Sequence, residues 1–120
     1  MRTLEMAIRP GSKPGQTVFE LVGALELQQV FGFQSKMRED ESPVTILDMS
    51  AVTYLDSAGI GALVNASISR QRRGRKFVIA GITDRARSVL DVTGTSQFFE
   101  FYSSAAEAEG QVKPISAAPA

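Results

Sequence analysis

One short segment combines an acidic residue, a hydroxyl group and several small neighbours. Residues 56–61 read DSAGIG, so that Asp56 precedes Ser57 and two glycines follow. Asp and Ser are favoured helix N-caps, and small neighbours leave a hydroxyl accessible to a kinase or a flat partner. The segment lacks the third glycine of a dinucleotide fingerprint, and Leu55 stands where a nucleophile elbow needs glycine. Two interpretations follow: a plain helix cap, or a serine that a partner recognises.

Asp48 is a second candidate, because it follows the apolar stretch 44–47 and so is expected at the carboxyl end of a buried strand. Ligands of α/β proteins gather at such ends. Response-regulator receiver domains place an aspartate there, but they also need an acidic pair after the first strand to hold magnesium. This chain has Arg9, Pro10 and Gly11 at that place. We therefore expect no metal site, and a structural role for Asp48 in holding loop amides.

A basic cluster is the third candidate: five of the seven residues from Arg70 to Lys76 are cationic. The cluster falls at the end of the clearest helical pattern, where cations complement the helix dipole. Solvated cations at a helix end are therefore the first interpretation. The alternative is a contact with a partner or with an anionic surface.

Composition excludes several classes of function. The chain of 120 residues has no Cys and no His, which excludes Ser-His-Asp hydrolases and the familiar zinc sites. Its 13 basic and 13 acidic residues balance, which argues against nucleic acid as the main partner. The longest apolar run, 58–64, is far shorter than the about 20 residues of a membrane span. No leader pattern is present, so we expect no membrane contact and a cytoplasmic location.

Apolar periodicity predicts strands alternating with helices, which indicates an α/β fold with a mostly parallel sheet and an opening antiparallel hairpin. We expect one domain over residues 1–110 and a flexible tail over 111–120. The predicted strands are Thr3–Arg9, Thr17–Val22, Val44–Leu47, Phe77–Ala80 and Phe98–Tyr102. The predicted helices are Glu26–Glu39, one beginning near Ser57, one capped by Thr83 and ended by Gly94, and Ser104–Glu109.

The run from Thr45 to Leu63, TILDMSAVTYLDSAGIGAL, resembles the signature of the STAS domain, and more narrowly that of the bacterial anti-sigma-factor antagonists. The stretches 73–82, 89–94 and 98–102 fit the same pattern, so the resemblance spans about Thr17 to Glu109. It implies a STAS-like single domain, with a small mixed sheet and about four helices mainly on one face.

The resemblance also implies a function. In this family the serine after the aspartate, here Ser57, is phosphorylated by a partner that is both anti-sigma factor and serine kinase, and a PP2C-type phosphatase resets it. Unphosphorylated, the antagonist sequesters that partner and a sigma factor is released. The chain would thus be a binding module without cofactor or enzymatic activity. The expected partner-binding residues are Glu26, Asp56, Ser57, Ala58, Gly59, Ile60 and Gly61.

Two points set this chain apart from the pattern. Glu26 stands where the family usually has Asp, and the segment 27–43 is short for the first helix of the family. An accessory or scaffold STAS protein, in a lipid-transport or stress-signalling assembly without phosphate cycling, is the alternative. We further expect Gly59 and Gly61 to allow close approach of a partner, so that Gly59→Val would keep the fold and weaken binding.

Overall fold

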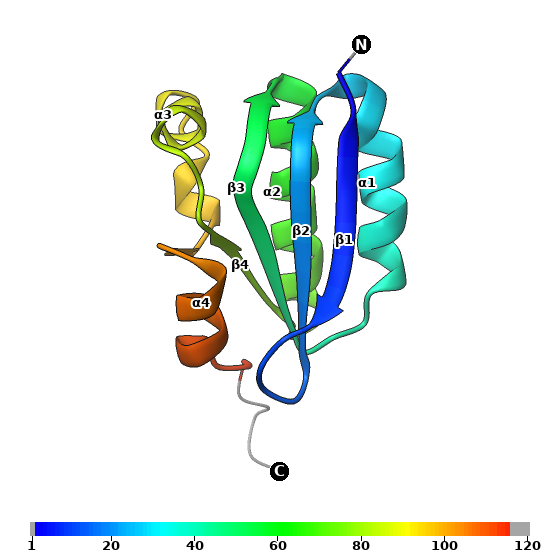
Figure 1. Cartoon of the computed structure of the whole chain (residues 1–120), viewed down its shortest axis with the longest axis vertical. Helices are drawn as coiled ribbons and strands as arrows, with labels where there is room; N and C mark the ends of the chain where they lie inside the picture. The colour runs from blue at the N-terminus through cyan, green and yellow to red at the C-terminus, as the bar shows by residue number, and fades with distance from the viewer. Residues whose placement is uncertain (1, 116–120) are drawn as a thin grey trace.

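The computed structural model describes residues 2–115, in which strands and helices alternate as the sequence predicts (Figure 1). The elements are β1 (Leu4–Pro10), β2 (Gln16–Leu25), α1 (Leu27–Glu39), β3 (Val44–Leu55), α2 (Ser57–Arg72), β4 (Lys76–Ala80), α3 (Asp84–Val92), the 3-10 helix η1 (Ser96–Phe98), β5 (Phe101–Tyr102) and α4 (Ala105–Gln111).

The sheet has the order β1-β2-β3-β4-β5, and only its first pair is antiparallel. The turn cluster 11–15 closes the β1–β2 hairpin, and Gly15 adopts a φ of 81° there, which side-chain-bearing residues rarely do. The later strands run parallel, because each is joined to the next through a helix. The mixed α/β sheet predicted from the sequence is confirmed.

Helices α1 and α2 lie behind the sheet in Figure 1, and α4 packs on its other face. The larger core cluster combines one face of β2 and β3 with Phe33 of α1, Leu63 of α2 and Leu90 of α3. The smaller cluster joins the opposite face of β2, β3 and β4 to Ala108 of α4 and to Val112. The helices therefore lie mainly on one face, as expected.

Several predicted boundaries differ from the structure; strand β2, for example, ends at Leu25 and not at Val22. Strand β3 continues to Leu55, so Asp48 lies inside the strand and not at its carboxyl end. Of the predicted last strand, Phe98 instead ends the 3-10 helix η1, residues 99–100 have no regular structure, and β5 keeps only two residues. The predicted tail 111–120 extends into 116–120, outside the described residues, and Val112 within it is 3% exposed and packs against α4.

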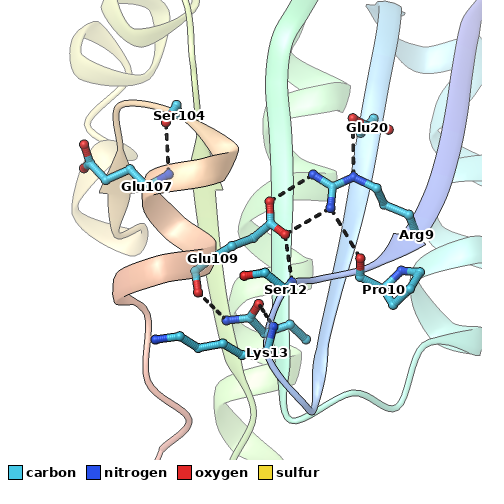
Figure 2. Close-up of polar contacts among 9 residues, drawn as sticks. Arg9, Pro10, Ser12, Lys13, Glu20, Ser104, Glu107 and Glu109 are labelled. Carbon is cyan, nitrogen blue, oxygen red and sulfur yellow. Dashed lines mark hydrogen bonds and ion pairs between the residues drawn. The ribbon is translucent and has the colours of Figure 1, made fainter.

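An ion pair fastens α4 to the opening hairpin (Figure 2). The guanidinium of Arg9 donates to both carboxylate oxygens of Glu109 at 3.0 Å, and the amide of Ser12 donates to one of them at 2.9 Å. The Gln16 side chain donates to the Glu109 carbonyl at 2.9 Å. The hydrogen bonds from Arg9 lower the pKa of the Glu109 carboxyl, and the charge of Arg9 and the Ser12 amide lower it further. Burial acts to raise this pKa but is outweighed. The clamp thus joins segments about a hundred residues apart in sequence.

The basic cluster is not uniformly solvated. Arg70 is 5% exposed, and it donates to Asp40 Oδ2 at 3.0 Å, to Thr45 Oγ1 at 3.0 Å and to the Met37 carbonyl at 2.6 Å. Burial acts to raise the pKa of Asp40, but hydrogen bonds from Ser42 and Thr45 and the charge of Arg70 outweigh it and leave that pKa lowered. Arg70 is therefore a structural residue that ties the end of α1 to α2, and the expectation of a solvated side chain is wrong for it.

Candidate partner-binding site

Parallel pairing of β2 and β3 brings the starts of two helices side by side. Leu25 and Leu55, the last residues of the two strands, are register partners. The amide of Asp56 donates to the Leu25 carbonyl at 3.4 Å, just where both strands give way to helices. The carboxyl ends of parallel strands share one edge of a sheet, and here α1 and α2 both begin at that edge.

Asp56 caps both helices. Its Oδ1 accepts a hydrogen bond from the Gly59 amide at 2.8 Å, which is the N-cap contact predicted for α2. Its Oδ2 accepts one from the Leu27 amide at 3.1 Å, at the first residue of α1. The carboxylate therefore satisfies amides at two helix N-termini, where a negative charge is also favoured by both helix dipoles.

Ser57 is the first residue of α2 and is exposed. Ala58 beside it is half-buried, and Gly61, one turn further along, is exposed, with no atom beyond its own stretch of helix within 4 Å of the place where a Cβ would stand. Because these residues are small, they have no long side chain that could cover the Ser57 hydroxyl. A phosphate at a helix start is compatible with the fold, because the helix dipole favours negative charge there.

Gly59 and Ile60 are buried, so they do not form surface that a partner could touch. A Cβ on Gly59 would stand 2.2 Å from the Leu25 carbonyl oxygen and 3.0 Å from the Leu55 side chain. The close approach that needs glycine is thus between α2 and the end of β2 inside this chain. The expectation that Gly59→Val would spare the fold is wrong for that reason.

Glu26 is held in an ion pair. Its carboxylate lies 3.2 Å from the guanidinium of Arg2, and that guanidinium lies 3.9 Å from the centre of the Tyr54 ring. The Gln29 side chain binds both neighbours, accepting from the Glu26 amide at 3.3 Å and donating to the Arg2 carbonyl at 2.8 Å. Sequence reasoning missed Arg2 and Tyr54, because nothing local in the sequence relates them to Glu26.

Two apolar side chains of α1 face solvent near the edge of the sheet where α1 and α2 begin. Leu27 is 68% exposed and Phe31 is 78% exposed. They are four residues apart and so lie on one side of the helix, while Phe33 and Met37 fill the core. The signal was present in the sequence, since Phe31 falls outside the helically spaced apolar series Val30, Phe33 and Met37. Leu27, whose amide binds the Asp56 carboxylate, and Phe31 one turn further along α1 give the site an apolar flank.

Asp48 does not belong to this site. It pairs in register with Glu20 of β2 and Ala80 of β4, and its Oδ1 accepts from the Ser50 amide at 3.0 Å. The predicted role in holding a neighbouring amide is therefore confirmed, although within a strand. Residues 2–115 contain no cluster of three His, Cys, Asp or Glu side chains that could hold a metal. Within the same range, no helix is both long enough and apolar enough to cross a membrane.

Comparison with known proteins adds to this geometry. The family model of the STAS domain matches residues 5–108. The anti-sigma-B factor antagonist of Listeria monocytogenes is 32% identical over 87 residues, which cover 72% of this chain and 68% of the relative.

Two solved structures share the fold. An anti-sigma factor antagonist from Mycobacterium paratuberculosis superimposes with a TM-score of 0.71 at 18% identity, over 83% of this chain and 86% of that chain. The Bacillus cell fate determinant SpoIIAA, solved in its phosphorylated form, superimposes with a TM-score of 0.59 at 16% identity, over 84% of this chain and 90% of that chain.

Proposed function

This chain belongs to the STAS domain family, and from that premise we propose that it is an anti-sigma factor antagonist whose binding is switched by phosphate on Ser57. The antagonist part of this proposal is supported by the Listeria relative, which is named an anti-sigma-B factor antagonist. In its unphosphorylated form the chain sequesters an anti-sigma factor, and a sigma factor is released. The chain acts as a binding module in the cytoplasm and carries out no catalysis itself.

The observation that carries the proposal is the position of Ser57. Its side chain is exposed at the first residue of α2, directly after a carboxylate that holds the starts of both α1 and α2. A kinase can therefore reach the hydroxyl without unfolding any element. The carboxylate fixes the backbone around it, so that partner and kinase meet a rigid surface.

Phosphate on Ser57 would act on binding more than on folding. It adds about −1.5 to −2 charges at neutral pH. The dipole of α2 accepts this charge, and the site is open to water, so the folded state loses little. A partner packed over Ala58 and Gly61 would instead have to bury the dianion next to Asp56, which is costly without a matched cation.

The partners of this proposal follow from the resemblance to the anti-sigma-factor antagonists. The anti-sigma factor acts as the serine kinase and supplies ATP and magnesium. A PP2C-type phosphatase removes the phosphate and restores binding. The proposed contact surface is flanked by Leu27 and Phe31. It consists of Glu26, Asp56, Ser57, Ala58 and Gly61.

The proposal is tested by capturing partners of the tagged chain from its native cell and mapping phosphate by mass spectrometry. We expect a kinase-type anti-sigma factor in the captured material and phosphoserine at position 57. Ser57→Ala should abolish the phosphate signal, whereas Ser50→Ala, which removes another exposed serine, should not. Capture of a constant partner with Ser57 never phosphorylated would favour the accessory or scaffold function instead.

A further inference from the structure

A groove runs between the C-terminal halves of α1 and α2, at the end of α2 remote from Ser57. Its volume is about 120 Å³. The apolar floor comes from Phe33 and Met37 of α1 and from Ala62 and Ala66 of α2. Because the two alanines have short side chains, the space above them stays open.

The rim of this groove is strongly basic. Arg38, Arg73 and Arg75 line it, together with the buried Arg70. Asp40 is the one acidic residue among the lining residues, and its carboxylate already accepts from Arg70 at 3.0 Å and from Ser42 at 2.6 Å. The neutralised Asp40–Arg70 pair leaves three guanidinium groups whose charge is not matched within the groove.

Helix C-termini carry partial negative charge, which would normally oppose an anion here. In this structure the carbonyls of Met37 and Arg70, near the ends of α1 and α2, are occupied by protein donors. Met37 O accepts from Arg70 Nη2 at 2.6 Å, and Arg70 O accepts from the amides of Arg73 and Arg75 at 3.0 and 2.9 Å. The carbonyls are thus turned toward protein donors, and the guanidinium groups dominate the field in the groove.

Neutral hydrogen-bonding groups complete the lining. Gln34 of α1 and Asn65 and Ser69 of α2 place two amides and a hydroxyl among the arginines. Planar guanidinium groups match the oxygens of phosphate in pairs, and amides and hydroxyls supply further donors. The combination of fixed charge and neutral donors around a small groove is typical of a site for a compact oxyanion.

We propose that this groove binds a phosphate-type oxyanion, either free phosphate or the phosphate group of a small ligand. The volume of about 120 Å³ is enough for a single phosphate group. The whole chain has no net charge, so the attraction arises from this local cluster. The inference does not depend on the proposed function of Ser57.

The test is isothermal titration calorimetry of the full chain with inorganic phosphate and with pyrophosphate, at constant ionic strength maintained by chloride. We expect saturable binding to one site with a dissociation constant of about 1 mM or tighter. Arg38→Ala and Arg73→Ala should each weaken binding about tenfold or more. Both side chains are exposed, so circular dichroism and the melting temperature should stay close to those of the unchanged chain.

Arg72→Ala is the matched control, since Arg72 is an exposed arginine at the end of the same helix that does not line the groove. It should bind phosphate as the unchanged chain does. An equal loss in Arg72→Ala would indicate general charge attraction and overturn the site. No saturable heat for either anion, or binding of an acidic peptide in place of phosphate, would also overturn it.

Amide chemical shifts locate the bound anion independently. Phosphate should move the backbone resonances of Asn65 and Ser69 and leave that of Ser57 unchanged. Shifts confined to the start of α2 would place the anion at the helix N-terminus and contradict the proposed groove.

Discussion

Asp56 Oδ2 accepts a hydrogen bond from the Leu27 amide at 3.1 Å, so the residue that caps α2 also holds the first residue of α1. The two helices are joined at their starts by one carboxylate, and Ser57 is the residue that follows it. The position of the proposed phosphorylation site therefore depends on both helices, although only α2 contains it.

Asp56→Ala removes an acceptor from two amides at once. We expect a loss of about 1–3 kcal/mol in the free energy of unfolding, because one cap contributes about 1 kcal/mol and a second amide also loses its acceptor. Urea titration measures the loss. Asp84→Ala is the control, since Asp84 is exposed in the first turn of α3 and that helix is capped by Thr83. Equal stability of the two variants would contradict the double cap.

Two glycines of α2 should respond oppositely to the same substitution. Gly59→Ala places a methyl group 2.2 Å from the Leu25 carbonyl oxygen and should destabilise the fold by about 1–3 kcal/mol. Gly61→Ala meets open space and should raise stability by up to about 1 kcal/mol, because alanine favours helix. Melting temperatures of both variants give the comparison. If Gly59→Ala melted at or above the temperature of the unchanged chain, the close contact between α2 and β2 would be refuted.

Much of the fold could be predicted from local pattern. The hairpin, α1 ending at Glu39 and α2 beginning at Ser57 follow from turn residues, period and capping residues. Strand β3 was predicted too short, because Asp48 and Ser50 interrupt its apolar run. Those polar residues do not end the strand, because α4 covers only part of the sheet face opposite α1 and α2 (Figure 1). The uncovered part of that face is open to water, where polar side chains are tolerated.

The site was predicted in part. The cap by Asp56 and the exposure of Ser57 follow from residue types, and the structure has both. The second bond to Leu27 depends on the register of β2 with β3, which no local pattern specifies. The buried Arg70 likewise needs Asp40, 30 residues earlier in the chain. Contacts between distant segments are set by tertiary packing, so the sequence alone could not reveal them.

Phe31→Ala should weaken binding of the anti-sigma factor about tenfold or more while changing stability by less than about 0.5 kcal/mol. Phe31 is 78% exposed, so its removal leaves no cavity in the core. Val92→Ala removes an exposed apolar side chain of α3 and should leave binding unchanged. Calorimetric titration with the captured anti-sigma factor measures both. Unchanged affinity for Phe31→Ala would remove α1 from the contact surface.

The Arg9–Glu109 clamp makes stability depend on acid pH. The pKa of Glu109 is lowered in the folded chain, chiefly by hydrogen bonds from Arg9, so folding favours its ionised form. Its stabilisation is present above the unfolded pKa, near 4.5, and is lost as the pH falls through the lower folded value. Glu109→Gln should therefore be less stable than the unchanged chain at pH 7, and the difference should shrink below about pH 4.

Urea titrations between pH 7 and pH 3 follow this difference. Glu107→Gln is the control, because Glu107 is half-buried on the same helix and its carboxylate accepts from Ser103 and not from Arg9. A stability difference for Glu109→Gln that stayed constant down to pH 3 would show that the ionised pair does not stabilise α4 against the hairpin.

The switch itself is tested most directly by comparing the affinity of the anti-sigma factor for the chain before and after phosphorylation of Ser57. Coupling of about 3 kcal/mol corresponds to at least a hundredfold difference in affinity. We predict that phosphoserine at 57 weakens binding by that factor, and that Ser57→Asp weakens it to a smaller degree. Ser57→Ala should bind like the unphosphorylated chain. All forms should melt within about 3 °C of one another. Equal affinity of the phosphorylated and unphosphorylated chains would contradict the account.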